Sequence, residues 1–329
     1  MSDWSLEVES GPNGIVGTGR NEKGDSFRVH LIPVFPGVTV AVNEIHCEML
    51  PPSAGTESTF REPPVSINYA LAGNCEVERL DGSITAVRGG ELSVSQIRAR
   101  RQQRFPGSLY EGIEIYLDPP VMEEQSGWLR DQFGIDTEWL LQQYYGRDGV
   151  RICQTPRAIG QIVEQVRKIL QAEEPDRILL RLLVLQLLHD LQTSLYPESS
   201  HMYLTESQVA LAHEAERRMM EDLRVTVTAR NLAREFQISD TSLKNYFHIV
   251  YGISMAAYLR RKRMAWAARL LVETDLPVGR VAEEVGYGNQ SKFAAVFREE
   301  YGRNPLEYRR SGRTQENRTG RHRTEKKRR

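Results

Sequence analysis

The chain has 329 residues, of which 40% are apolar and 26% charged, and its formal net charge is −1. This composition is that of a folded globular protein and excludes a disordered or fibrous chain. Three widely spaced cysteines, Cys47, Cys75 and Cys153, exclude a disulfide framework and a cysteine-based metal cluster. The first residues lack the pattern of a signal peptide, and no apolar run reaches the ~20 residues of a membrane-spanning helix. We therefore expect a cytoplasmic protein without a membrane partner.

Charge is distributed unevenly along the chain. Residues 1–203 have a net charge of −10, residues 204–308 of +1 and residues 309–329 of +8. An acidic body that ends in a basic segment is typical of proteins that bind a polyanion. A solvated, disordered terminus explains the same tail, so charge alone does not decide between the two readings.

Residues 27–117 have the pattern of a β domain. Short, partly alternating apolar runs are separated by turn sequences such as Pro36-Gly37, Ala72-Gly73-Asn74, Asp81-Gly82 and Gly89-Gly90. The expected strands are 27–32, 38–48, 65–71, 75–80, 84–87, 91–95 and 112–117. Their regular spacing favours a small antiparallel barrel or jelly roll.

From residue 121 onward the pattern becomes helical. Ile159, Ile162, Val163 and Val166 recur every three or four residues, which predicts a helix with one apolar face. A second helix is expected over residues 177–194, where leucine is too frequent for one narrow stripe. This helix is either buried against the β domain or paired with a second copy of the chain. Residues 196–201 then form a linker.

The clearest pattern in the chain is an internal repeat. Residues 232–238 match residues 281–287, and Leu243 and Phe247 match Phe293 and Phe297. Each copy predicts a short helix, a tight turn and a second helix that ends at a glycine. The expected helices are 229–236, 241–251, 278–285 and 290–301. Two copies are too few for a solenoid, but they match two helix-turn-helix units, with each second helix available for a DNA major groove.

The outward faces of the second helices favour DNA binding over plain structural packing. They carry short or amide-bearing polar residues, namely Ser239, Asp240, Thr241, Lys244, Asn245 and His248 in the first copy and Asn289, Gln290, Ser291, Lys292 and Ala295 in the second. Asn and Gln pair with adenine, Lys pairs with guanine, and Ala or Thr contacts the methyl group of thymine. A merely solvated helix would be richer in Glu–Lys pairs.

A long helix is expected between the copies, over residues 255–271. It contains the basic run Arg260-Arg261-Lys262-Arg263, which could neutralise DNA phosphates or simply face solvent. Because a helix turns by about 100° per residue, the four charges cannot all face one DNA backbone. We expect one or two of them to contact phosphate.

Several motifs follow one another over residues 227–309. They include Leu232-Ala233, Gly252-Ile253-Ser254, Val285-Gly286-Tyr287 and Asn304-Pro305. In order and spacing they resemble the DNA-binding domain of AraC/XylS-family bacterial transcription regulators. The sequence GISMAAYLRRKRMAWAARLL is similar to the branch of that family that includes the ferric-pyochelin regulator. The chain departs from the family at Asn304, where serine is usual, and at Ala295, where relatives often carry a long polar side chain.

The resemblance implies two recognition helices in successive major grooves on one side of the DNA. By position it assigns base contacts to Thr241, Lys244, Asn245, Gln290, Ser291 and Ala295. Backbone contacts are expected from Ser239, Asn289, Lys292, Arg260 and Arg261. It further implies double-stranded promoter DNA and RNA polymerase as partners, activation of transcription and a small-molecule effector. We also expect nucleoid association and, through the leucine-rich helix over 177–194, a homodimer.

The N-terminal region is loosely similar to the cupin-like sensing domains of that family. Candidate effector-binding residues are Arg28, His30, His46, Tyr69 and Tyr116. No His-x-His pair accompanies them, so we expect no metal and no cofactor.

The sequence therefore predicts an α+β chain with four parts. These are a cupin-like β-barrel or jelly roll over 1–120, a helical dimerisation and linker segment over 121–200, an all-α double helix-turn-helix domain over 204–310 and a basic disordered tail over 311–329. The expected function is an effector-responsive transcriptional activator without enzymatic activity. Two alternatives stay open: a ligand-independent DNA-binding regulator with a degenerate barrel, and a cupin-type metalloenzyme.

Overall fold

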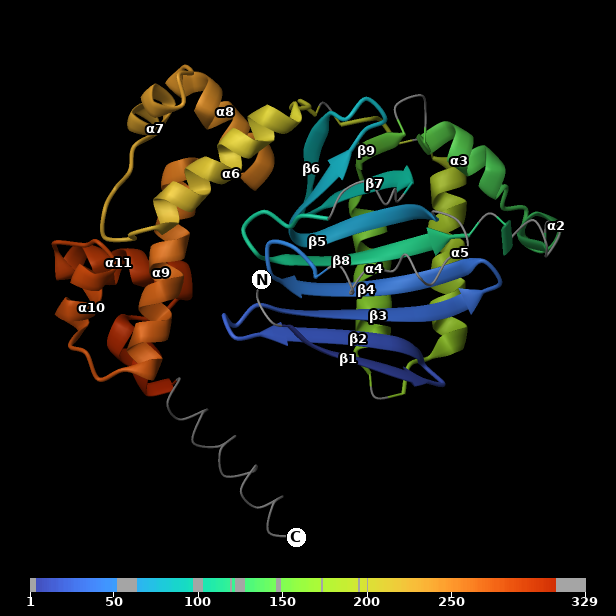
Figure 1. Ribbon diagram of the computed structural model, residues 1–329. Helices are drawn as coiled ribbons and strands as arrows, with labels where there is room; N and C mark the ends of the chain where they lie inside the picture. Colours follow the sequence, from blue (N-terminus) through green and yellow to red (C-terminus); the bar gives the residue numbers. More distant parts are fainter. Residues whose placement is uncertain are drawn as a thin grey trace, which may run out of the picture. The chain divides into compact units, whose positions relative to one another are not determined.

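The computed structural model describes residues 4–51, 64–96, 103–118, 120–121, 128–145, 149–172, 174–194, 196–199 and 201–311. The chain divides into two compact units. The first consists of Met1–Ser207 and Ile249–Gly252, and the second of Gln208–His248 and Ile253–Arg329. The first unit holds the strands and helices α2 to α5, and the second holds most of helices α6 to α11 (Figure 1). Residues 312–329 of the expected tail lie outside the described residues.

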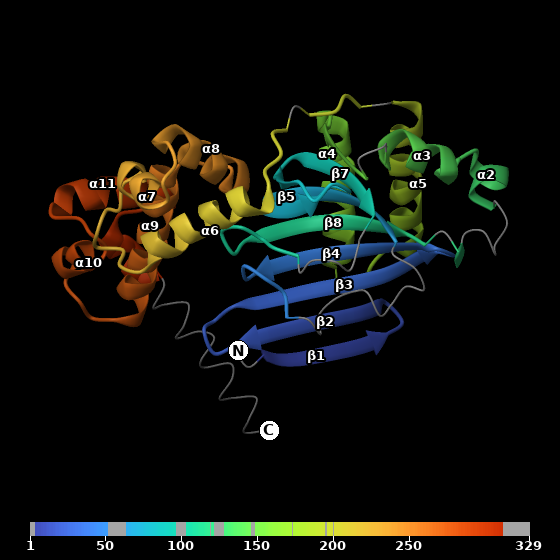
Figure 2. The ribbon, with the colours of Figure 1, turned by 45° about the horizontal axis from the view of Figure 1, so that its top comes forward.

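The first unit is built on one antiparallel sheet of nine strands (Figure 2). The strand order is β1-β2-β3-β4-β8-β5-β7-β9, and β6 pairs with the last residues of β5. The bounds are β1 Trp4–Gly11, β2 Gly14–Asn21, β3 Ser26–Phe35, β4 Val38–His46, β5 Val65–Glu78, β6 Ile84–Arg88, β7 Glu91–Gln96, β8 Tyr110–Leu117 and β9 Val150–Gln154. Among the described strands, β1 and β9 are the two edge strands of this order. The sheet is open, and the expected barrel or jelly roll is not confirmed.

The strands differ from the expected ones in two ways. The runs 65–71 and 75–80 form one strand, β5, because the expected turn at Ala72-Gly73-Asn74 is a bulge, with a register shift between Ala70 and Ala72. Gly73 has a φ of +75° there. Strands β1, β2 and β9 were not expected. The sequence of β1 alternates, with Trp4, Leu6 and Val8 between polar residues, and this signal was missed, although most of the strand is exposed. β9 is a short strand inside a segment with a helical pattern.

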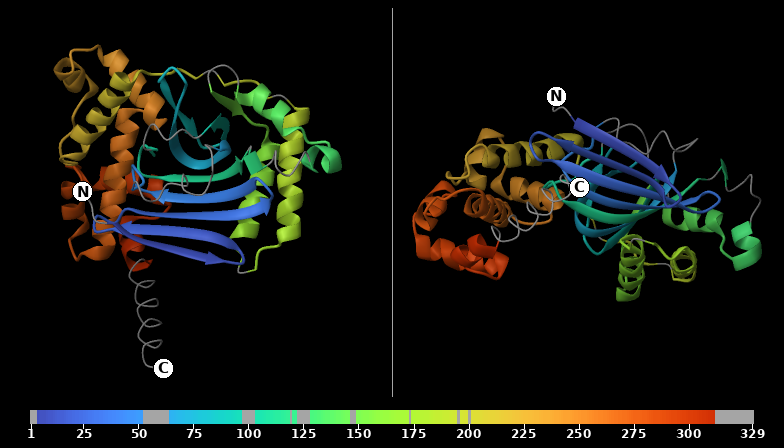
Figure 3. Two further views of the ribbon diagram at one scale, coloured as in Figure 1. Left: turned by 45° about the vertical axis from the view of Figure 1, so that its right-hand side comes forward. Right: turned by 90° about the horizontal axis from the view of Figure 1, so that it is seen from below.

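Helices cover one face of the sheet. α4 (Arg157–Leu170) and α5 (Arg177–Thr193) lie side by side across it (Figure 3), while the shorter α2 (Trp128–Phe133) and α3 (Thr137–Tyr145) precede β9. The expected inward residues of α4, from Ile159 to Val166, are all buried, and each fully buried aliphatic side chain contributes about 1.5–3 kcal/mol.

The leucine-rich helix α5 has two apolar faces. One face is buried in the core shared with α4 and the sheet, through Leu180, Leu183, Val184, Leu187, Leu188 and Leu191. The other face leaves Ile178 73%, Leu179 42% and Leu182 57% exposed. Packing inside the unit therefore accounts for only part of the leucine content.

The opposite face of the sheet has a core of its own. Since side chains alternate along a strand, residues such as Phe27, Ala41 and Tyr110 point away from the helices and pack together there. This core encloses the carboxylate of Glu114, which accepts hydrogen bonds from Asn43 Nδ2 and from the hydroxyl of Ser66, each at 3.0 Å. Burial raises the pKa of Glu114 above its usual value, and these donors oppose the rise.

The expected linker is attached to the sheet. Backbone bonds of 2.8 and 2.7 Å join Ile84 to Leu204 in both directions, and the N–H of Ser199 donates to the carbonyl of Ile152. His201 Nε2 lies 3.0 Å from a carboxylate oxygen of Glu91, and both side chains are largely buried. The chain therefore leaves this unit at Leu204.

The second unit is all helical. Its helices are α6 Glu206–Met220, α7 Ala229–Glu235, α8 Asp240–Tyr251, α9 Met255–Glu273, α10 Val278–Glu284 and α11 Gln290–Tyr301. Every helix expected for the repeat and its connection is present, with ends within two residues of the expected ones. Side-chain oxygens of Thr228, Ser254 and Asn289 cap α7, α9 and α11 by accepting a backbone N–H three residues on.

One arginine of the basic run in α9 is a structural residue. Arg263 is only 9% exposed, and it donates from Nε to the carbonyl of Leu223 at 2.7 Å and from Nη2 to the hydroxyl of Thr226 at 3.1 Å. Its guanidinium also lies over the ring of Tyr287. Burial lowers the pKa of Arg263, although an arginine stays charged at neutral pH. Arg263 thus links α9 to the segment before α7 and to the turn after α10.

The described residues include neither a membrane-spanning helix nor a cluster of metal ligands. No helix there is long and apolar enough to cross a membrane. Within the same ranges, no three His, Cys, Asp or Glu side chains come together as metal ligands. All three cysteines are free and buried, and burial raises the pKa of Cys47 to about 12.

Gly73→Ala is expected to lower the free energy of unfolding by about 3–5 kcal/mol, against about 1–2 kcal/mol for Gly90→Ala. Both glycines have positive φ, so both variants carry backbone strain. An added Cβ at Gly73 would overlap the carbonyl oxygen of Leu109, whereas nothing lies within 4 Å of one at Gly90. Urea unfolding followed by tryptophan fluorescence measures the difference. Equal costs would contradict the bulge geometry.

Arg263→Ala is expected to destabilise the second unit by about 2–4 kcal/mol, because it removes a largely buried side chain together with its bonds to Leu223 and Thr226. Arg261→Ala removes an exposed arginine from the same helix and should cost less than about 0.5 kcal/mol. Differential scanning calorimetry of both variants makes the comparison. A small effect at both positions would show that Arg263 is only a surface charge.

Candidate nucleic-acid interface

Aromatic packing sets the orientation of α11. Phe293 and Phe297 are fully buried in a cluster that also includes Met264 of α9 and Val281 of α10. Tyr287 meets Phe293 edge-on at 5.8 Å between ring centroids. Because these inward residues lie one helical turn apart, the opposite face of α11 must point to solvent.

The same arrangement recurs in the first copy. Leu243 and Phe247 of α8 are fully buried, and Phe247 meets Tyr258 of α9 edge-on at 5.4 Å. The two turns match as well, since Gln237 and Gly286 both have positive φ, of +58° and +80°. A side chain at Gly286 would come within 2.7 Å of Arg263 Nη2, so this position requires glycine for space as well as for conformation.

All six residues expected to read bases are exposed. They are Thr241, Lys244 and Asn245 on α8 and Gln290, Ser291 and Ala295 on α11. Each set lies in the N-terminal half of its helix. Thr241 and Asn245 on α8, and Ser291 and Ala295 on α11, face away from the buried pair, whereas Gln290 is the first residue of α11 and lies on the same side as Phe297. Side chains at such positions can reach base edges when the N-terminal part of a helix enters a major groove.

The N-terminus of each helix is capped by a residue expected to contact the DNA backbone. The hydroxyl of Ser239 accepts from the N–H of Ser242 at 3.0 Å, and the side chain of Asn289 accepts from the N–H of Lys292 at 2.9 Å. These caps hold the first turn of each helix in shape, where the helix dipole favours an anion such as phosphate. Lys244 forms an exposed ion pair of 2.8 Å with Asp240, so DNA would have to compete with that carboxylate for its ammonium group.

The two arginines expected at phosphate lie near carboxylates of α11. Arg260 Nη1 is 3.8 Å from Glu299 and Arg261 Nε is 3.9 Å from Glu300, and all four side chains are substantially exposed. Exposed pairs of this length contribute about 0–1 kcal/mol, so phosphate can displace them. The role of Arg263 was missed because its basic neighbours made it look like part of a solvated run. Its signal in the sequence is the glycine at position 286, which leaves room for the guanidinium.

The five candidate effector residues do not form one site. Arg28 and His30 of β3 line a pocket on the helix-covered face of the sheet. Tyr69 is on that face too, where its hydroxyl would meet a side chain placed at Gly160 of α4. His46 is exposed at the end of β4. Tyr116 is buried on the opposite face, where its hydroxyl donates to Glu114, so a site that combines it with Arg28 and His30 is ruled out by the alternation of β8.

The comparisons with known proteins concentrate on the second unit. Residues 232–311 match a family model described as a helix-turn-helix domain. The transcriptional regulator ExsA of Pseudomonas aeruginosa is 33% identical over 75 residues, which cover 23% of this chain and 27% of that protein. The virulence regulon transcriptional activator VirF of Yersinia enterocolitica is 35% identical over 77 residues, which cover 23% of this chain and 28% of VirF. The transcriptional activator RhaR of an Enterobacter species is 31% identical over 116 residues, and the alignment covers 32% of this chain and 40% of RhaR.

These alignments span less than half the length of each of the three relatives. Among solved structures, the C-terminal domain of AraT from Geobacillus stearothermophilus is 30% identical, covers 31% of this chain and 84% of that chain, and gives a TM-score of 0.30. ToxT from Vibrio cholerae is 8% identical, and its alignment covers 83% of this chain and 98% of the ToxT chain with a TM-score of 0.30. Residues 232–311 therefore form a helix-turn-helix domain of the type found in AraC-family transcriptional regulators.

Proposed function

We propose that this chain regulates transcription by reading two adjacent major grooves of promoter DNA with α8 and α11. The observation that carries the proposal is the repeated construction of the second unit. Each helix buries a matched pair, Leu243 with Phe247 and Phe293 with Phe297, and turns a polar face of DNA-compatible residues to solvent. A purely structural repeat has no need of that polar face.

Base recognition is assigned to the six exposed residues of α8 and α11. Asn245 and Gln290 have the amide group that pairs with adenine, and Lys244 has the ammonium group that pairs with guanine. Thr241 and Ser291 can bond to either kind of base edge. Ala295 offers only a methyl contact with thymine, so α11 reads fewer positions than its length would allow.

Contacts with the DNA backbone are assigned to five residues. Lys292, Arg260 and Arg261 supply cations, while Ser239 and Asn289 hold the helix N-termini at which phosphate is favoured. These contacts position the protein without reading sequence.

We further propose that the chain activates transcription in response to a small molecule. The names of VirF and RhaR describe activators, which supports activation through RNA polymerase here as well. The first unit is the sensing part in this proposal, a cupin-like domain in function although its sheet is open. A regulator that needs no ligand is the alternative, and DNA affinity that never responds to a ligand would favour it.

We also propose that the chain forms a homodimer through α5. Ile178, Leu179 and Leu182 give this helix an exposed apolar face that the unit itself does not cover. A two-fold axis across the helix would set this face against its own copy, which is the usual geometry of a homodimer.

Lys244→Ala and Gln290→Ala are each expected to weaken binding to the preferred site by about 1–3 kcal/mol, or roughly 5- to 150-fold, and to relax preference at separate base pairs. Lys168→Ala removes an exposed lysine from α4 and serves as the control. Fluorescence anisotropy with the preferred duplex and with single-base variants measures both effects. Equal loss on preferred and random DNA would contradict the assignment of these side chains to bases.

Leu182→Glu is expected to convert the dimer to a monomer, because it places a charge in the centre of the apolar face of α5. Gln186→Glu, one turn further on at an exposed position, adds the same charge beside that face and should leave most of the dimer intact. Analytical ultracentrifugation gives the oligomeric state. A wild-type chain that is monomeric at all concentrations would refute the dimer.

A further inference from the structure

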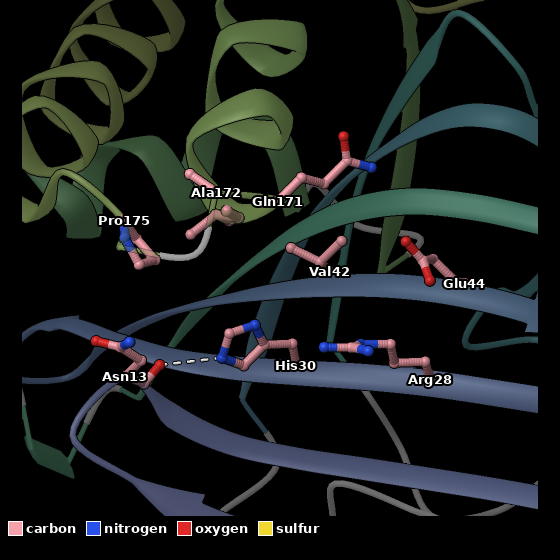
Figure 4. Close-up of a pocket in the computed structure, with 9 residues that line it drawn as sticks. Asn13, Arg28, His30, Val42, Glu44, Gln171, Ala172 and Pro175 are labelled. Carbon is pink, nitrogen blue, oxygen red and sulfur yellow. Dashed lines mark hydrogen bonds between the residues drawn. The ribbon is translucent and has the colours of Figure 1, made fainter. Parts of the chain in front are cut away.

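We propose that a pocket on the helix-covered face of the N-terminal sheet binds a small zwitterion, namely an amino acid or a close derivative. The pocket has a volume of about 420 Å³ and lies among β3, β4, the turn between β1 and β2, and the end of α4 (Figure 4). Sites for small molecules have volumes of this order. The polar side chains at the pocket are Asn13, Arg28, His30, Glu44 and Gln171.

Opposite charges lie side by side on two neighbouring strands of the pocket without forming an ion pair. Arg28 of β3 and Glu44 of β4 are partners in the strand register. No ion pair joins them in the described part of the chain, although cross-strand partners of opposite charge ordinarily interact. A guanidinium and a carboxylate held in this way can receive the carboxylate and the ammonium group of one ligand.

The neighbouring charges favour a zwitterion over a simple anion. Glu111 of β8 is the next cross-strand partner of Glu44, so two carboxylates stand beside one arginine. Arg167 of α4 is close enough to interact electrostatically with Glu44 and Glu111, but its guanidinium is bound to Glu164 by two hydrogen bonds of 2.8 and 2.7 Å. A ligand with only negative charge would gain from Arg28 but would be repelled by the carboxylates.

His30 adds a directed acceptor to the pocket. Its Nε2 donates to the carbonyl oxygen of Asn13 at 3.0 Å, and burial lowers the pKa of the ring below its usual value. This shift favours the neutral imidazole, in which Nδ1 is left as an acceptor for an ammonium group or hydroxyl. The turn that presents Asn13 is supported in turn by Arg177, whose Nη2 lies 3.5 Å from Asn13 Oδ1.

Apolar walls limit the rest of the ligand. Val42, Leu170 and Pro175 line the pocket beside the charged groups, which suits a short aliphatic side chain. Pro175 belongs to the connection that leads into α5, the helix to which we assign dimerisation. The inference rests on the proposed function in one respect only, that the bound zwitterion acts as the effector.

The test is thermal unfolding of the full chain with each of the twenty common L-amino acids in turn, without DNA. At a concentration of about 100 times Kd, the best amino acid should raise the Tm by about 5–10 °C. Titration calorimetry with that amino acid should show at least a tenfold loss of affinity in Arg28→Gln and in Glu44→Gln. The matched controls Arg20→Gln and Glu7→Gln change exposed strand residues outside the pocket and should bind as the wild type does.

Three results would overturn the inference. They are no Tm shift with any amino acid, unchanged affinity in both pocket variants, or equal affinity for the deaminated analogue of the best amino acid. A change in DNA affinity on adding the ligand is measured separately. If the ligand binds but DNA affinity does not respond, the site stands and its role as the effector site fails.

Discussion

The C-terminal unit depends on one helix that carries both halves of the repeat. α9 packs against α8 near its start, through Tyr258 on Phe247, and against α10 and α11 further along, through residues such as Met264 and Leu271. Arg263 stands between these two regions and ties α9 to the segment before α7 and to the turn at Tyr287. The direction of one helix-turn-helix relative to the other is therefore set by side chains of a single rigid element. Loss of its buried guanidinium would loosen both halves at once.

Charge in this unit is largely balanced locally. Exposed arginines at positions 217, 224, 269 and 280 each pair with an Asp or Glu at most four residues away. The net charge over residues 204–308 is only +1. Few counterions would then be released on binding, so the dependence of affinity on salt should be shallow for this region, and base contacts must supply much of the affinity. Specific binding is favoured over general attraction to DNA.

The sequence predicted the second unit far better than the first, for physical reasons. The packing of short helices is determined by a few residues. The spacing of Leu243 and Phe247 and a glycine such as Gly286 therefore suffice to predict a helix-turn-helix from the sequence. Strand β1 carries only the short alternation of Trp4, Leu6 and Val8, and most of its side chains are exposed, so no buried pair marks it as clearly. The bulge at Gly73 looked like a turn because both need positive φ. Alternation along β3 already places Arg28 and His30 on one face, but the separation of Tyr116 from them depends on strand register, which alternation alone does not specify.

The proposed mode of binding places two helices of one chain in two successive major grooves. The most direct measurement is selection of bound sequences from a randomised duplex pool, using the full-length protein at about 150 mM salt. Binding in two successive grooves predicts an enriched site with two preferred blocks whose centres lie about 10–10.5 base pairs apart. A single block, two blocks without fixed spacing, or no enrichment over the starting pool would contradict it.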